Sequence, residues 1–199
     1  MKKIIVLGIL FIFCPLVMLA QQKGNQISEK EWDTLIALLK TEKWDKVEKV
    51  SKEYLKRFEK ASDTLADPAI VRYMYLRCVG AELGEKKITK EQSLKKVSNL
   101  IGKTIITPPR QFREKCVFNC LKLTEDNQNL SSCGSNNDNT IIQTFETYIM
   151  ADPTVIKNIS QLENKDLRLG GYIKSINAEG FTMPRLEVIF DNAFIWEEE

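Results

Sequence analysis

The chain has 199 residues, with 29 Lys and Arg, 27 Asp and Glu, and no histidine. Without histidine it lacks the usual general base at neutral pH, the common partner of a Ser or Cys nucleophile, and the commonest zinc ligand. We therefore expect a protein that is not an enzyme and that uses no cofactor and no metal.

The first twenty residues have the layout of a secretory signal, with Lys2 and Lys3 followed by an apolar run over 4–20 and then polar glutamines. We expect cleavage after Ala20, a flexible mature N-terminus over 21–27, and a periplasmic or secreted bacterial protein without a stable membrane span. A retained membrane anchor is the alternative, because about 17 apolar residues is the short limit for a span.

The charges are balanced in total but uneven along the chain. Removal of Lys2 and Lys3 leaves 29 − 2 = 27 basic and 27 acidic residues. Residues 21–107 hold 18 Lys and Arg against 13 Asp and Glu, and residues 108–199 hold 9 against 14. A balanced total argues against general binding to nucleic acid or to a membrane surface. Residues 129–149 contain no Lys or Arg, so we expect no nucleic-acid partner.

Four helices are predicted in a helical hairpin domain over 28–107, because apolar residues recur there every three or four positions. Ser28 with Glu31 and Thr89 with Gln92 form capping boxes, and Asp67 is the expected cap of the third helix. The predicted helices cover about 29–41, 44–58, 68–84 and 90–101.

Two stretches, LLKTEKWDKVEKVSKEYLKRF and DPAIVRYMYLRCVGAELGEKKITKEQSLKKV, resemble tetratricopeptide repeats. The resemblance implies two antiparallel helical hairpins. A plain helical bundle is the alternative.

The second half, 108–199, reads as β-rich. After the prolines of TIITPPRQF, alternating segments predict strands over 115–123, 129–136 and 139–149, then a short helix after Asp152, then two more strands in KDLRLGGYIKSIN and RLEVIFDNAFIW. Gly170 and Gly171 are expected to mark a bulge or bend.

This order of elements resembles the OB-fold over about 112–197. The resemblance implies a five-stranded antiparallel barrel with a helix between the third and fourth strands. The expected fold class is therefore α+β, with repeat-like helical hairpins packed on a five-stranded OB-like antiparallel β domain. An unrelated antiparallel sheet is the alternative.

Three cysteines lie in the predicted hairpin KCVFNCLKLTEDNQNLSSCGSNND. If Asp126 and Asn127 form a two-residue turn, the numbers of facing residues sum to 253, so Cys120 faces Cys133. That position is not hydrogen-bonded, and Cα atoms there approach to about 4.5 Å, within disulfide range. We predict a Cys120–Cys133 disulfide. Free buried thiols are the alternative, and a bond between Cys78 and Cys116 stays open.

The sequence favours an exported, non-enzymatic protein-interaction or scaffold protein of the bacterial cell envelope, with another envelope protein as its partner. The alternative is an OB-like domain that binds a glycan or a small ligand. Aromatic residues are the candidates for either surface: Trp44, Tyr54, Phe194 and Trp196 for a protein partner, and Phe145, Tyr148 and Tyr172 for a ligand.

Overall fold

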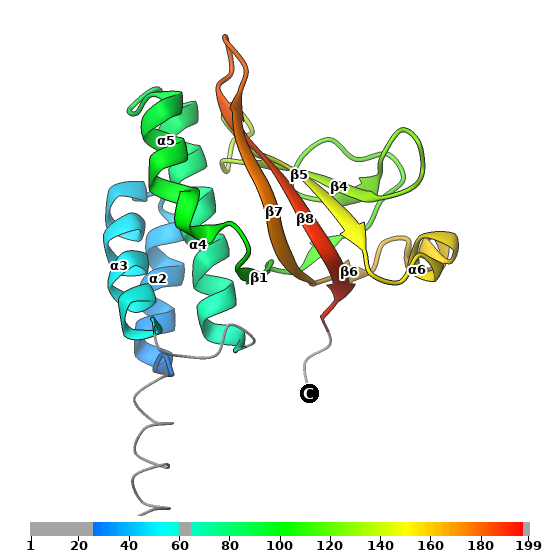
Figure 1. The fold of residues 1–199 in the computed structure, drawn as a ribbon, viewed down its shortest axis with the longest axis horizontal. Coiled ribbons are helices and arrows are strands. Elements are labelled where there is room, and N and C mark those ends of the chain that lie inside the picture. Colours follow the sequence, from blue (N-terminus) through cyan, green and yellow to red (C-terminus); the bar gives the residue numbers. More distant parts are fainter. Residues whose placement is uncertain (1–25, 60–64, 197–199) are drawn as a thin grey trace, which may run out of the picture.

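The computed structural model describes residues 26–59 and 65–196, so the expected signal segment 1–20 lies outside the described residues. A helical layer packs on one side of a curved sheet (Figure 1). The fold class is therefore α+β, as predicted. The helical layer contains α2 (Glu29–Lys40), α3 (Trp44–Arg57), α4 (Ala66–Gly84), α5 (Lys90–Val97) and the 3-10 turn η1 (Ser98–Leu100).

The capping boxes at Ser28 and Thr89 are present and begin α2 and α5 as predicted. The start of α4 differs, because this helix begins at Ala66 and Asp67 does not cap it. The Asp67 carboxylate instead accepts a hydrogen bond from the Ile27 backbone N–H at 2.8 Å. Ile27 is buried, so the end of the segment predicted to be flexible is held against the helices.

The main sheet has six strands in the order β1-β7-β8-β5-β4-β3. Neighbouring strands are antiparallel except β5 and β8, which are parallel. The prediction of five antiparallel strands is therefore wrong. The strands are β1 (Thr104–Ile106), β3 (Leu121–Leu123), β4 (Leu130–Ser135), β5 (Ile142–Met150), β7 (Leu169–Glu179) and β8 (Arg185–Ile195).

The parallel pair follows from the path of the chain after β5. This path runs through α6 (Thr154–Lys157), the 3-10 turn η2 (Ile159–Leu162) and β6 (Asp166–Leu167) before it enters β7. Because β7 lies on the far side of β8, the β7–β8 hairpin brings β8 back beside β5 in the same direction. The predicted bend is present, since the β7–β8 register shifts between Gly170 and Tyr172.

The predicted boundary at 107/108 falls between β1 and β2, after the main sheet has begun. The three residues of β1 belong to the range assigned to the helical domain, yet all three are buried and pair with β7. A second small sheet forms where β2 (Arg110–Gln111) pairs with β6. The short segment after the helices therefore contributes to both sheets.

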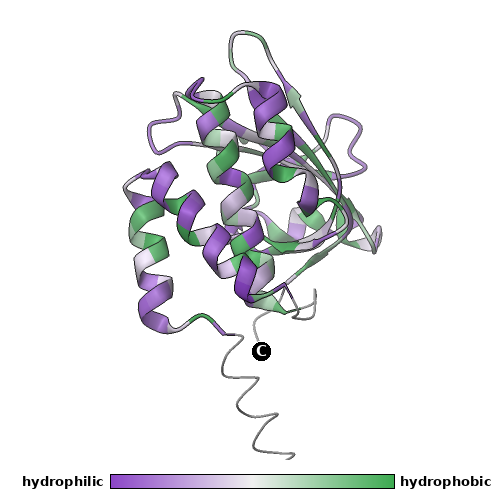
Figure 2. Cartoon of the chain, turned by 60° about the vertical axis from the view of Figure 1, so that its left-hand side comes forward, coloured by the Kyte–Doolittle hydropathy of each residue, from purple (hydrophilic) through white to green (hydrophobic). Residues whose placement is uncertain are grey.

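Helix α4 is shared by two hydrophobic clusters, one with α2 and α3 and one with the sheet. Hydrophobic and hydrophilic residues alternate along the helices (Figure 2), as expected for elements with buried and solvated sides. Gly80 lets α4 approach β5 closely, because a Cβ at this position would lie 2.4 Å from the Gln143 carbonyl oxygen. The side of α4 toward the sheet holds Leu76, Val79 and Leu83, and the other side holds Val71, Cys78 and Ala81.

The β3–β4 hairpin has the predicted register, with Leu123 opposite Leu130. Its turn is longer than predicted, because the Thr124 N–H donates to the Asn129 carbonyl at 2.9 Å and leaves residues 125–128 in the loop. The numbers of residues that face each other therefore sum to 253 as predicted, although Asp126 and Asn127 do not form a two-residue turn.

The Cys120–Cys133 prediction is nevertheless wrong, since Cys120 forms its disulfide with Cys116 at a Cα–Cα distance of 6.2 Å. Cys133 is a buried free thiol, as is Cys78. The pairing of β3 with β4 ends at Leu121, so Cys120 lies outside the paired residues. Asn119 adopts a left-handed conformation (φ 53°) and its N–H donates to the Cys133 carbonyl at 2.7 Å. This irregular backbone brings Cys120 to Cys116.

Peptide mapping of the non-reduced protein should therefore recover Cys116 joined to Cys120, with Cys78 and Cys133 alkylated only after unfolding. Replacing Cys116 and Cys120 by Ser should lower the free energy of unfolding by about 2 kcal/mol, the loop-closure value for a five-residue loop. A peptide that joins Cys120 to Cys133 would contradict the pairing.

Candidate functional site

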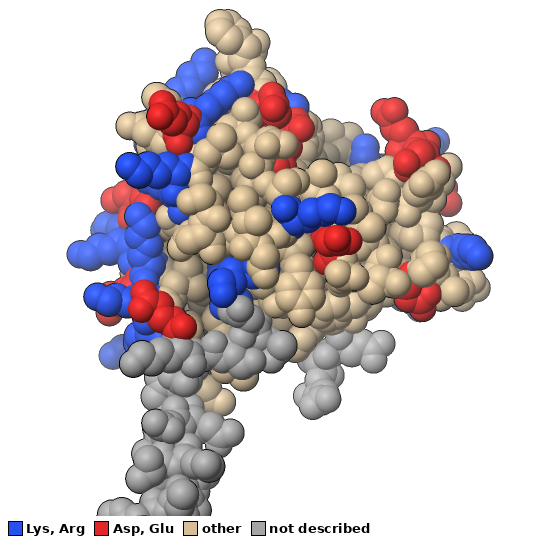
Figure 3. All heavy atoms as spheres, viewed as in Figure 1, with Lys and Arg blue, Asp and Glu red and all other residues tan. Residues whose placement is uncertain are grey.

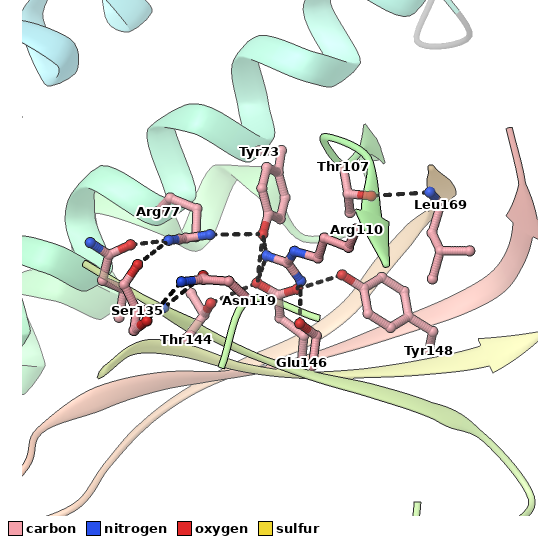
Figure 4. Close-up of polar contacts among 12 residues, drawn as sticks. Tyr73, Arg77, Thr107, Arg110, Asn119, Ser135, Thr144, Glu146, Tyr148 and Leu169 are labelled. Carbon is pink, nitrogen blue, oxygen red and sulfur yellow. Dashed lines mark hydrogen bonds and ion pairs between the residues drawn. The ribbon is translucent and has the colours of Figure 1, made fainter. Parts of the chain in front are cut away.

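A cluster of buried polar side chains joins α4 to the sheet (Figure 4). We call it the interior cluster. Tyr73 and Arg77 come from α4, Arg110 comes from β2, and Glu146 and Tyr148 come from β5. The arrangement follows local periodicity, because positions 73 and 77 share one side of a helix and positions 146 and 148 share one face of a strand.

The Glu146 carboxylate is the centre of the interior cluster. One oxygen accepts from the Tyr73 hydroxyl at 2.8 Å and from the Thr144 hydroxyl at 2.6 Å. The other oxygen accepts from Arg110 Nη1 and from the Tyr148 hydroxyl, each at 2.5 Å. The carboxylate is therefore satisfied on both oxygens although it lies in the interior.

Arg110 and Glu146 form a fully buried ion pair, with 3% and 0% of their side chains exposed. Arg110 Nη1 also donates to the Ser132 hydroxyl at 2.5 Å, and Nη2 donates to the Tyr73 hydroxyl. The pair thus links β2, β4, β5 and α4. Removing one partner of such a pair leaves an uncompensated buried charge, which is strongly destabilising.

Burial alone would raise the pKa of the Glu146 carboxyl, but the charge and hydrogen bonds of Arg110 outweigh it and lower the pKa to about 2. Burial raises the pKa of Tyr73 to about 12 and also raises the pKa of Tyr148 well above its ordinary value. At neutral pH the cluster therefore holds an ionised carboxylate and two neutral phenols. The contacts of Tyr73 and Arg77 with Glu146 and Gln143 of β5 join α4 to the sheet.

Residues of the strands that point away from α4 form a second feature, the outer sheet face. We define it by Phe145, Tyr172, Ile189, Phe194 and Trp196. Thr144, Glu146 and Tyr148 point inward, so Phe145 between them points outward. Tyr172, Ile189 and Phe194 are 36–40% exposed, and the Phe194 and Trp196 rings lie 6.1 Å apart.

The outer sheet face is mostly uncharged over β7 and β8, whereas Lys and Arg gather on the helical side (Figure 3). The charged residues that do border it are paired. Lys174 lies 3.4 Å from Asp191, and Arg185 lies 2.7 Å from Glu187. The face therefore combines exposed aromatic residues with a neutralised border.

A groove of about 700 Å³ adjoins this face, between strands β3–β5 and the segment that contains Cys116. Its floor includes Ser131, Phe145 and Thr147. The Arg185 guanidinium lies 4.3 Å from the centroid of the Phe145 ring, so one face of that ring is already occupied. The groove is also lined by Val117, Phe118 and Leu123, so it offers apolar as well as polar contacts.

The structure divides the predicted site residues between the interior and the outer sheet face. Trp44 and Tyr54 are buried in the cluster between α2, α3 and α4. Tyr148 is fully buried and stacks on Phe190 at 4.8 Å. The ligand trio of Phe145, Tyr148 and Tyr172 is thus not brought together. Tyr172, Phe194 and Trp196 do share one face.

Sequence reasoning missed Arg110 and the role of Glu146. Glu146 lies in the predicted strand 139–149 and Arg110 in the segment TIITPPRQF, and neither was a candidate site residue. The alternation Thr144, Glu146 and Tyr148 was a visible signal, since it places three polar groups on one face of a strand. Its partner lies 36 positions away, so the pair could not be read from local spacing.

Comparison with known proteins shows no matching family model, no similar curated protein and no similar solved structure. Within residues 26–59 and 65–196, no helix is long and apolar enough to cross a membrane. The same residues contain no group of three or more Cys, Asp or Glu side chains placed to hold a metal ion.

Replacing Glu146 by Gln should lower the free energy of unfolding by about 3–5 kcal/mol, because Arg110 would stay buried without a counter-ion. Urea unfolding measures the change. Glu187→Gln is the matched control on the same sheet, because its side chain is 41% exposed and pairs with Arg185, so its effect should be within about 1 kcal/mol. Equal effects of the two variants would contradict a structural role for the buried pair.

The stability should also depend on pH through Glu146. Its folded pKa is lowered, so the stability that it contributes is complete above its ordinary pKa of 4.5 and is lost as the pH falls toward about 2. The contribution is on the order of 3 kcal/mol. The double variant Arg110→Met with Glu146→Leu lacks the buried pair. Between pH 4.5 and 2 it should lose about 3 kcal/mol less unfolding free energy than the wild type loses. If the double variant loses as much unfolding free energy at low pH as the wild type, the pH dependence does not come from Glu146.

Proposed function

We propose that this protein is a non-enzymatic binding protein that contacts another protein through its outer sheet face. The observation that carries the proposal is a group of aromatic residues at one end of the outer sheet face: Tyr172 of β7 and Phe194 of β8 are exposed, and Trp196, just after β8, is half-buried beside Phe194. Aromatic residues dominate the centres of protein interfaces because they bury large areas at a low entropic cost.

The border of the outer sheet face supports this proposal. Protein interfaces typically have an apolar core and a polar rim. Here the Lys174–Asp191 and Arg185–Glu187 pairs lie beside the aromatic residues. Because their charges are already neutralised within the chain, a partner need not supply compensating charges at the rim.

The location belongs to the same proposal. The N-terminal layout of two lysines, an apolar run and a small residue supports export and cleavage after Ala20, which would place the protein in the periplasm or outside the cell. The partner would then be another protein of the cell envelope. The resemblance of the helical sequence to tetratricopeptide repeats supports a scaffold role.

Binding of a glycan or small ligand by an OB-like domain is the second candidate. The groove of about 700 Å³ beside β3–β5 supports it, as does the succession β3, β4, β5, α6, β7 and β8. The stacking of Arg185 on Phe145 disfavours it, because the guanidinium already covers one face of the ring that the sequence predicted as a stacking surface. We therefore favour the protein partner.

A photo-crosslinking amino acid at position 172 should give a discrete adduct with one envelope protein, read by mass spectrometry. Adding Phe194→Ser should reduce the adduct yield at least about tenfold, the loss typical of an interface hot spot. The matched control carries the crosslinker at position 181 in the β7–β8 turn, where Phe181 is 99% exposed, and should not give this adduct. An adduct equally strong from position 181, or insensitive to Phe194→Ser, would overturn the proposal.

A further inference from the structure

A cavity of about 190 Å³ lies on the other side of β5, where the α2–α3 turn, α4 and the β4–β5 turn meet. Leu39, Trp44 and Met74 give it an apolar wall, and Arg77 and Gln143 give it a polar wall. An apolar cavity of about 150 Å³ can hold benzene. The volume therefore suits a small molecule with the bulk of about one aromatic ring.

The mouth of the cavity is held by contacts between distant parts of the chain. The Asn137 backbone N–H donates to the Glu42 carboxylate at 2.6 Å, and the Asn137 side-chain amide donates to the Lys40 carbonyl at 3.1 Å. These bonds tie the β4–β5 turn to the end of α2. The cavity is therefore formed without a ligand.

Gln143 brings an unused donor to the polar wall. Its side-chain oxygen accepts from Arg77 Nε at 2.6 Å, which fixes the orientation of the amide. Gln143 is fully buried, and its Nε2 has no hydrogen-bond partner among the described residues. Buried donors are almost always paired. This nitrogen lies just beneath the cavity wall with almost no accessible surface, so an acceptor from outside the chain reaches it after a small shift of the amide.

Arg77 brings an unbalanced charge to the same place. Its acceptors are neutral: the Gln143 amide, the Ser135 carbonyl at 2.8 Å and the Tyr73 hydroxyl at 3.4 Å. No carboxylate of residues 26–59 or 65–196 forms an ion pair with it. The interior cluster contains two guanidinium groups and one carboxylate, a net charge of +1. The other charged group that lines the cavity is the Glu42 carboxylate, which lies at the mouth and accepts from the Asn137 N–H.

We propose that this cavity binds a small monocarboxylic acid with an apolar body about the size of one aromatic ring. The carboxylate accepts hydrogen bonds from Arg77 and from Gln143 Nε2, and it neutralises the excess charge of the interior cluster. The apolar body packs against Leu39, Trp44 and Met74. The Glu42 carboxylate at the mouth repels a second negative charge, which restricts the ligand to one carboxylate.

Benzoate is the probe for this site. Titration of the protein followed by NMR should give a dissociation constant on the order of 1 mM or tighter, as expected for a ligand of so few atoms. Benzyl alcohol, which lacks the charge, and phthalate, which adds a second one, should each bind at least about tenfold more weakly. Equal binding of benzoate and benzyl alcohol would overturn the carboxylate assignment, and equal binding of phthalate would overturn the limit to one charge.

Substitutions place the binding in this cavity. Met74→Trp fills the apolar wall without touching the polar groups, and it should weaken benzoate binding at least tenfold. The matched control is Met183→Trp, in the β7–β8 turn where Met183 is 56% exposed, and it should leave binding unchanged. Arg77→Met should also weaken benzoate binding at least tenfold. If that variant fails to fold, the effect of Met74→Trp tests by itself whether benzoate binds in this cavity. Benzoate binding that is the same in Met74→Trp and in the wild type would overturn the proposal.

Discussion

The buried pair of Arg110 and Glu146 is the constraint on which the arrangement of layers depends. It joins the short β2 segment to the middle of β5, and the Tyr73 hydroxyl adds α4 to the same carboxylate. Apolar packing alone does not specify how α4 is rotated or shifted on the sheet, because hydrophobic contacts are not directional. A carboxylate with all of its acceptor positions occupied permits few alternatives, so the pair favours one arrangement.

The constraint also divides the sheet into two faces with different roles. The inner face packs against α4 and holds the interior cluster. The polar groups of this cluster have hydrogen-bond partners, and the unpaired nitrogen of Gln143 lies beside Arg77. The outer sheet face has no such commitments and keeps Tyr172 and Phe194 exposed. Because the two faces belong to the same strands, a residue's position in the alternation decides whether it serves stability or is free for binding.

Local patterns predicted the helices well and the strands in part. Capping boxes at Ser28 and Thr89 and helical periodicity depend on residues within one or two turns, so sequence reasoning could find them. The register of the β3–β4 hairpin was also local. Strand direction is not determined by local residues, because the parallel pairing of β5 with β8 depends on where β7 lies in the sheet. The polar cluster was hidden because Arg110 meets Glu146 only after the sheet has formed.

The place of β8 in the sheet determines when the six-stranded sheet can be completed during folding. This strand is the last of those described, yet it lies between β7 and β5 at the middle of the sheet. Until it is added, β1–β7 and β3–β4–β5 are separate pieces with open edges, and the sheet side of α4 is only partly covered. Pairing residues as distant as Thr147 and Ile189 requires a large loop to close first, which slows folding relative to the helices. During synthesis the chain therefore carries unpaired strand edges until β8 emerges, a state that chaperones recognise.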